Sequence, residues 1–188
     1  MQIVVQGPFN YENVITDGEL KAHLRVTHSL EDSLIQDIRA AAIQYVEQYC
    51  NTRLGTFTAY GYLPDFRSSY IPIGPVNSVT AVEYETDNSG TLATLAAANW
   101  HTDIKSHVGR IAFSDYPEPY EYAIMPVRIT MNVGHSLTLL PAPLMAAVRL
   151  IAGHLYENRQ DEVIGTITSR LRLGVDALVS PFRYIHQS

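Results

Sequence analysis

The spacing of hydrophobic residues changes twice along this 188-residue chain, and this change constrains the fold most strongly. Residues 16–54 and 141–159 place apolar side chains three and four positions apart, which predicts helices. Residues 56–133 instead contain short runs rich in Val, Ile, Thr and Tyr between turn sequences, which predicts antiparallel strands. We therefore predict an α+β fold, a single domain whose helical core has two N-terminal helices and one long C-terminal helix. An antiparallel β region is inserted in this core, and residues 160–188 form a C-terminal extension.

The two N-terminal helices carry start and stop signals. Residues 16–19 have the T-x-x-E form of a capping box, and residues 29–32 predict a second N-terminal cap of this kind. Gly55 is the predicted stop of the second helix. Residues 1–15 are expected to form an extended arm.

The predicted C-terminal helix begins with two prolines and has a broad apolar face. Small residues along it would let another helix approach closely, so the first inference concerns packing and assembly. Cys50, the only cysteine, is predicted to be a small core residue. The residues expected to form the helical core and subunit packing are Leu34, Ile38, Tyr45, Tyr49, Leu144, Val148, Ile151, Leu155, Tyr156 and Arg159.

The C-terminal extension is too apolar to remain in water. Residues 163–173 alternate in part, which predicts an extended stretch or hairpin, and Gly174 is expected to break it. Residues 175–179 make at most one or two helical turns before two aromatic residues near the chain end. This segment either folds back onto its own core or docks in another subunit, and the sequence leaves both open.

Composition excludes several classes of function. A net charge of −6 argues against binding nucleic acid by neutralising phosphates. No apolar run reaches the roughly 18 residues that a membrane span needs, so we expect no membrane association. The N-terminus has no basic region followed by an apolar one, which favours synthesis in the cytoplasm.

Candidate catalytic residues are few. Ser136 lies in a G-x-S-x-x sequence that lacks the second glycine of a nucleophile elbow. Glu83 and Glu85 share one face of a predicted strand and could bind a cation, although a solvated strand face explains them better. The seven histidines lack the spacing of metal ligands. We expect no enzyme activity, no metal and no cofactor, and keep a hydrolase that uses Ser136 or Glu83 and Glu85 as an alternative.

One loop has the composition of a protein contact. Residues 117–122, PEPYEY, combine prolines, acids and tyrosines without Lys or Arg. Tyrosine is enriched at protein interfaces, so this loop is a plausible interface element without an assigned partner.

Three blocks, taken in order, carry a family resemblance. Residues 20–49 contain LKAHLRV and LEDSLI before the second helix, residues 141–159 end in YENR, and residues 173–183 end in SPFR. Together they resemble the head–tail connector (adaptor, head-completion) proteins of long-tailed bacteriophages and related gene-transfer particles. Leu155 and Phe182 stand where that family commonly has Trp and Tyr, and residues before Thr16 have no counterpart.

The resemblance implies a structural virion protein in the neck. Such proteins form a ring, typically a dodecamer, beneath the portal, extend the DNA channel and dock the next neck, stopper or tail protein. DNA passes through the ring without sequence-specific binding. A tail-terminator or neck-stopper ring is the alternative. By resemblance, the residues that would bind the portal are Gly174, Val175, Leu178, Val179, Pro181, Phe182 and Arg183. We expect the domain to remain folded without residues 174–188.

Overall fold

The computed structural model describes residues 1–7, 10–106, 108–158 and 169–184, with backbone alone for residues 169–173. Helices and antiparallel sheets are both present, which confirms an α+β protein. The described residues of 1–8, 56–135 and 184–188 form one compact unit, the β unit, and those of 9–55 and 136–183 form another, the helical unit. Within the described residues, no helix combines the length and the apolar character that crossing a membrane requires.

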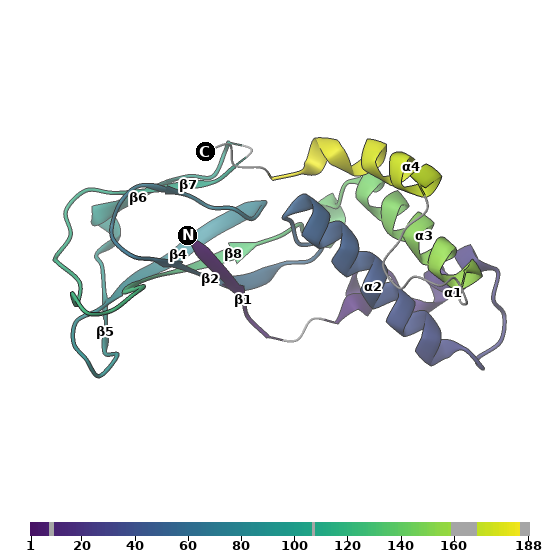
Figure 1. Ribbon diagram of the computed structural model, residues 1–188, viewed down its shortest axis with the longest axis horizontal. Coiled ribbons are helices and arrows are strands. Elements are labelled where there is room, and N and C mark those ends of the chain that lie inside the picture. The colour runs from purple at the N-terminus through teal and green to yellow at the C-terminus, as the bar shows by residue number, and fades with distance from the viewer. Residues whose placement is uncertain (8–9, 107, 159–168, 185–188) are drawn as a thin grey trace. The chain divides into compact units, whose positions relative to one another are not determined.

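The helical unit contains four α-helices within its described residues (Figure 1). These are α1 (Asp17–Leu24), α2 (Asp32–Cys50), α3 (Ala142–Glu157) and α4 (Ser169–Val179). Helix α3 packs against α1, α2 and α4, so it is the centre of the unit. Short 3-10 turns flank these helices: η1 (Tyr11–Asn13), η3 (Leu137–Leu139) and η4 (Ser180–Phe182).

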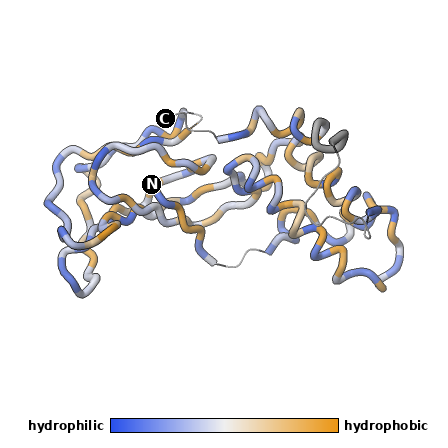
Figure 2. Tube along the Cα trace, in the orientation of Figure 1, coloured by the Kyte–Doolittle hydropathy of each residue, from blue (hydrophilic) through white to orange (hydrophobic). Residues whose placement is uncertain are grey.

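The core of the helical unit follows from the predicted periodicity. Hydrophobic and hydrophilic residues are interleaved along α2 and α3 (Figure 2), and the apolar ones meet between the helices. Leu144, Val148 and Ile151 of α3 are almost completely buried, as are Ile35, Ile43 and Val46 of α2, and this is the burial that stabilises the unit.

The ends of α1 and α2 test the predicted start and stop signals. The first capping box is confirmed, because Glu19 N–H donates to Thr16 Oγ1 (3.2 Å) and Thr16 N–H donates to Glu19 Oε2 (2.9 Å). The second is wrong, because Glu31 caps α2 without a side-chain hydrogen bond. The predicted stop at Gly55 is also wrong: α2 ends at Cys50, and its C-cap, Asn51, has φ 50° in the left-handed region that Asn tolerates.

Helix α4 is longer than the one or two helical turns predicted for residues 175–179, and it adds a helix to the predicted count. The chain is helical from Ser169 through Gly174 to Val179, so Gly174 does not break it and residues 169–173 are not extended. Glycine inside a helix costs about 1 kcal/mol relative to alanine. Val175 and Val179, four positions apart, are buried in the helical core, and their burial offsets this cost. Residues 163–168 of the predicted extended stretch lie outside the described residues.

The β unit contains two antiparallel sheets within its described residues, which confirms the predicted strand type. The first has the order β1-β2-β8-β4-β5 and the second the order β3-β7-β6. The strands are β1 (Gln2–Val5), β2 (Phe57–Leu63), β3 (Ser69–Tyr70), β4 (Val76–Glu85), β5 (Leu92–Thr94), β6 (Trp100–Asp103), β7 (Arg110–Phe113) and β8 (Val127–Val133).

Strict alternation along β8 fixes which residues face the core of the β unit. Val127, Ile129, Met131 and Val133 are buried and the residues between them are half-buried, as a central strand with one core face requires. The N-terminal arm becomes edge strand β1 and pairs with β2. Strand β5 and the early start of β4 at Val76 were not predicted.

Candidate functional site

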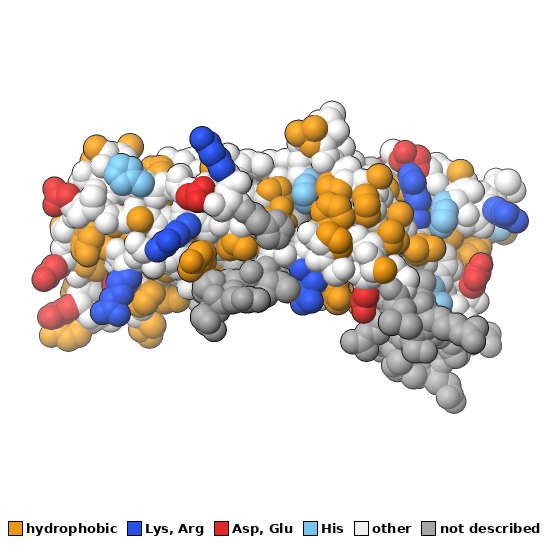
Figure 3. Space-filling view, turned by 90° about the horizontal axis from the view of Figure 1, so that it is seen from above, with side chains coloured by type: hydrophobic (Ala, Val, Ile, Leu, Met, Phe, Trp, Pro, Cys, Tyr) orange, Lys and Arg blue, Asp and Glu red, His pale blue; other side chains and the backbone are white. Residues whose placement is uncertain are grey.

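Exposed hydrophobic side chains mark where each unit can contact other proteins. Figure 3 shows several of them gathered on the helical unit and others at the left-hand end of the β unit. On the helical unit they include Leu30, 89% exposed, and Leu139, 79% exposed. On the β unit the most exposed are Tyr122 and Ile124, which share one loop.

The C-terminal segment is held against α2 of its own chain. Arg183 Nε donates to the carbonyl oxygen of Tyr49 (3.1 Å), and its guanidinium carbon lies 4.6 Å from the centre of the Tyr49 ring. Tyr45 stacks on the same ring, with centroids 6.3 Å apart. A hydrogen bond, a cation–π contact and a stacked pair thus converge on Tyr49 and fix the end of the segment.

The contact between α2 and the C-terminal segment raises the pKa of two side chains. Burial raises the pKa of the Cys50 thiol to about 11, and Cys50 Sγ donates to the carbonyl oxygen of Val179 (3.7 Å). Burial, followed by a hydrogen bond to Asp176, raises the pKa of the Tyr49 hydroxyl. Cys50 is therefore a neutral core residue, as predicted, and the neutral thiol is a poor nucleophile.

The residues predicted to bind the portal divide into two sets. Val175 (1% exposed) and Val179 (0%) lie inside the helical core, where they hold the segment in place. Gly174 and Pro181 are exposed, and Leu178, Phe182 and Arg183 are half-buried. Only the second set is accessible to a partner while the segment stays packed.

Nine of the ten residues predicted for helical packing are described, and they lie in the core of the helical unit or pack against it. Ile38, Leu144, Val148 and Ile151 are buried, and Tyr156 hydrogen-bonds Glu31 Oε2 through its hydroxyl (2.5 Å). Arg159 lies outside the described residues. Leu34, Tyr45, Tyr49, Leu155 and Tyr156 are partly buried and pack against this core.

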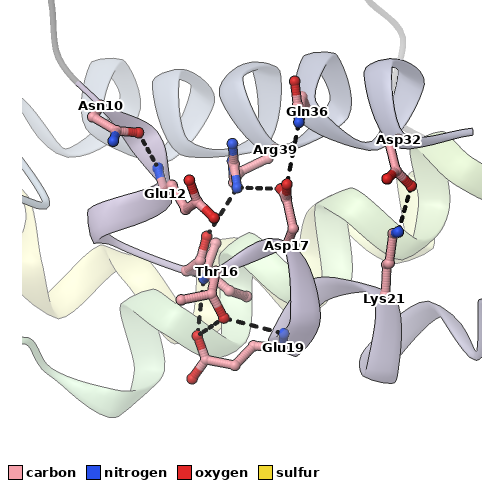
Figure 4. A network of polar contacts seen from close by, with 10 residues as sticks. Asn10, Glu12, Thr16, Asp17, Glu19, Lys21, Asp32, Gln36 and Arg39 are labelled. Atoms are coloured by element: carbon pink, nitrogen blue, oxygen red, sulfur yellow. Dashed lines mark hydrogen bonds and ion pairs between the residues drawn. The ribbon is translucent and has the colours of Figure 1, made fainter. Parts of the chain in front are cut away.

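A polar network attaches the start of α1 to α2 (Figure 4). Arg39, only 7% exposed, donates from Nη1 to Asp17 Oδ1 (2.5 Å), and Gln36 Nε2 donates to Asp17 Oδ2 (3.1 Å). Lys21 forms an ion pair with Asp32. A buried arginine in the apolar face of α2 requires such a carboxylate partner, and this pairing fixes α1 on α2.

A second buried charge organises the end of α2. Glu47 is 4% exposed, and its Oε1 accepts a hydrogen bond from Leu54 N–H (2.8 Å). Burial raises the pKa of this carboxyl, while the Leu54 N–H and Arg53 act in the opposite direction. The carboxyl thus satisfies a backbone donor after the helix, which is a structural role.

The two candidate acids of the β unit, Glu83 and Glu85, make contacts within the β unit itself. Arg128 donates from Nε (3.0 Å) and Nη2 (2.9 Å) to Glu83 Oε2, and the two residues face each other across β4 and β8. Glu85 ends β4, and its backbone bonds to Pro126 and Tyr120. A cross-strand ion pair accounts for Glu83 without a metal or a substrate.

Ser136 does not lie in a nucleophile elbow. Its hydroxyl is 3.3 Å from that of Thr138 in an exposed turn, and in the described contacts no histidine or acid bonds to it. Asn158 Nδ2 hydrogen-bonds His154 Nδ1 (3.0 Å), which gives this histidine a structural role at the end of α3. Across the part of the chain that the structure describes, no three His, Cys, Asp or Glu side chains gather where they could hold a metal ion.

The sequence did not reveal which residues make these contacts. Tyr49 was expected on a packing face and Arg183 in the terminal segment, but nothing in the sequence paired residues 134 positions apart. Arg39 is different, because an arginine between Ile38 and Ala42 in an apolar stripe could have indicated a buried ion pair.

Both units present exposed apolar side chains that can contact other proteins. Residues 18–128 match the family of phage gp6-like head-tail connector proteins, and this match covers more than half of the chain. The chain therefore belongs to that family of structural connectors, which is not an enzyme class.

Solved structures give the same assignment of the fold. The chain is similar to one in the neck of an empty gene transfer agent (GTA) particle computed with C6 symmetry, with 25% identity and a TM-score of 0.77, over 100% of this chain and 98% of that one. A chain in the virion of the native GTA particle has 24% identity, a TM-score of 0.77 and the same coverage. A chain in the native GTA neck computed with C12 symmetry has 24% identity and a TM-score of 0.73, over 98% and 97%. No curated protein matches.

Proposed function

We propose that the chain is an adaptor subunit of the virion neck, which joins the portal of the head to the next neck or tail protein and extends the DNA channel. The match of residues 18–128 to the head-tail connector family carries this proposal. Similarity to chains in the neck of gene transfer agent particles supports the location.

The adaptor works as a closed ring of identical subunits, and we propose twelve copies. The related neck was computed with C12 symmetry in one case and C6 in another, and twelve copies satisfy both. A ring closes through head-to-tail contacts, so every subunit needs two different complementary faces. The exposed leucines of the helical unit, Leu30, Leu137, Leu139 and Leu150, are candidates for these faces.

The portal contact is assigned to the accessible side of residues 174–183. Gly174 and Pro181 are exposed, with Leu178 and Phe182 half-buried beside them. The inner side of the same segment is anchored by Val175, Val179 and the Arg183–Tyr49 contact. An anchored segment binds with a smaller loss of conformational entropy than a free tail.

The acidic composition suits a conduit for DNA. With a net charge of −6, the chain does not gain affinity by releasing counterions from phosphates, so DNA can pass without being held.

The direct test is binding of the purified protein to portal-bearing heads that lack it, measured by co-sedimentation. The expected result is saturable binding at one copy for each portal subunit. Absence of binding to heads, together with binding to isolated tails, would contradict the adaptor assignment and favour a tail-terminator.

Point variants test the portal contact better than truncation. Deleting residues 174–188 would remove Val175 and Val179 from the core, so we expect truncation to lower the stability of the helical unit as well as portal binding. Ala177→Glu instead adds a charge to the exposed side of α4, and Ala98→Glu in η2 (Ala97–Asn99) is the matched control. Burying an unpaired charge at a contact should weaken head binding by at least about tenfold, whereas the control should bind as wild type.

A further inference from the structure

The longest loop of the β unit presents two large apolar side chains to solvent. This tip loop, residues 114–126, joins β7 to β8, and Tyr122 is 76% exposed and Ile124 88% exposed within it. The proposed contacts of the helical unit use neither residue. Large exposed apolar side chains that lie two positions apart in one loop point to a protein contact.

The tip loop is fixed at its base. Tyr120 N–H donates to the carbonyl oxygen of Glu85 (2.8 Å), and Glu85 N–H donates to that of Pro126 (2.9 Å). Tyr116 stacks on Phe66, with ring centroids 4.8 Å apart, and Tyr120 contacts Tyr122 edge to face at 5.6 Å. Three prolines, at 117, 119 and 126, limit the backbone further. The apolar side chains are thus presented by an ordered loop, which reduces the entropy lost on binding.

The tip loop that carries the exposed pair is acidic. The tip loop contains Asp115, Glu118 and Glu121, all exposed, and neither Lys nor Arg. The turn after β4, bonded to the loop through Glu85, adds the exposed Asp87. Figure 3 shows acidic and hydrophobic side chains together at the left-hand end of the β unit. Such a surface repels phosphates and fits a protein pocket that is apolar inside and basic at its rim.

We infer that the tip loop inserts Tyr122 and Ile124 into an apolar pocket, rimmed by Lys and Arg, of the neighbour on the tail side of the neck. The inference rests on the proposed function. That proposal assigns the portal contact to the helical unit, so the β unit is available to bind the neighbour on the tail side. That neighbour is a different protein from this chain.

A second copy of this chain fits the loop poorly. The chain is acidic overall, and the β unit has four Lys or Arg residues. Arg128 pairs with Glu83, Arg67 pairs with Asp65, Arg110 lies 5.3 Å over the Tyr70 ring, and the exposed Lys105 interacts electrostatically with Asp103. These engaged cations leave little to complement the acids of a neighbouring tip loop.

The test joins three purified components: heads without the connector, the full-length chain, and tails of the same particle. The variant Tyr122→Ala/Ile124→Ala removes the Tyr120–Tyr122 ring contact but keeps the two backbone hydrogen bonds with Glu85 and the Tyr116–Phe66 stack. Tyr70→Ala, also an exposed residue of the β unit, is the control. The double variant should occupy heads as wild type does, yet lower the apparent affinity for tails by about thirtyfold, as truncation of an interface anchor does. The control should join tails normally.

Electron microscopy separates the outcomes by scoring occupied heads and joined particles independently. Normal joining of tails by the double variant would overturn the inference, and so would its failure to occupy heads, because the loop would then belong to the portal or ring contact. If wild-type protein itself does not occupy heads, the proposed function fails instead.

A charge-reversal arm tests the basic rim. Glu118→Lys/Glu121→Lys should slow the joining of tails and reverse its dependence on salt, whereas Glu12→Lys in the helical unit should change neither. Unchanged rates for the loop variant would exclude a basic rim.

Discussion

The C-terminal segment of the helical unit and the tip loop of the β unit use their apolar residues in opposite ways. The helical unit covers its own terminal segment, so that Val175 and Val179 are no more than 1% exposed. The β unit leaves Tyr122 and Ile124 at least 76% exposed on a loop that is fixed at its base. In the first arrangement the apolar surface is buried and stabilises the fold. In the second it stays exposed and can bind a partner.

The charged residues differ in the same way. The helical unit buries Arg39 and Glu47 with partners inside the chain. In the β unit, Asp87, Asp115, Glu118 and Glu121 remain at the surface. Buried pairs specify how helices fit together, whereas surface charges of one sign select a partner and its approach.

One substitution made in both units tests the contrast most strongly. Ile151→Ala, at a position 2% exposed, should lower the free energy of unfolding by about 2–5 kcal/mol, because it leaves a cavity in the helical core. Ile124→Ala, at a position 88% exposed, should change it by no more than about 0.5 kcal/mol. Urea denaturation measures both, and equal effects would contradict the contrast.

Removing a buried charge should have the next largest effect. Arg39→Met leaves Asp17 without its closest partner and should lower the free energy of unfolding by about 1.5–3 kcal/mol. Asp17 is partly exposed, so water can solvate its unpaired carboxylate and reduce this loss of stability. In a double-mutant cycle with Asp17→Asn, a coupling near zero would show that the pair does not fix α1 on α2.

A smaller effect of opposite sign is expected in α4. Gly174→Ala should raise the free energy of unfolding by about 0.5–1 kcal/mol, because alanine favours the helix and an added Cβ would meet nothing within 4 Å. Gly153→Ala in α3 is the matched control, where the added Cβ would lie 3.6 Å from His23. If Gly174→Ala also weakens head binding, the proposed portal contact includes this position.

The smallest effect concerns acid stability. Burial lowers the pKa of His135 below its ordinary value of 6.5, and within the described contacts its buried Nε2 has no hydrogen-bond partner. The neutral imidazole is therefore the form that the fold favours. Its contribution to stability is fully present above pH 6.5 and is lost as the pH falls below that value. The midpoint temperature of thermal unfolding should fall less steeply with decreasing pH in His135→Asn than in wild type. Parallel curves of midpoint against pH would exclude this role.

Local patterns in the sequence predicted most helices and strands, but not which of them pack against each other. The capping box at residues 16–19 and the stripes of α2 and α3 depend on neighbouring residues, so they could be read directly. The first part of helix α4 was missed because Gly174 disfavours a helix locally, whereas the burial of Val175 and Val179 depends on helices far away in the sequence.

Contacts between residues far apart in the sequence also limited the prediction of the exposed surfaces. The edge strand β1 was expected only as an extended arm, since its pairing with β2 joins residues about 60 positions apart. The acidic and aromatic character of the tip loop was legible, but its fixed base depends on Phe66 and Glu85 from other parts of the chain.

The most direct test of the adaptor assignment is the symmetry of the protein bound to portal-bearing heads, determined by cryo-electron microscopy without imposed symmetry. We expect a closed ring of twelve copies on the portal axis, with the exposed side of α4 in contact with the portal. Copies bound away from that axis, or density that does not close into a ring, would contradict the account.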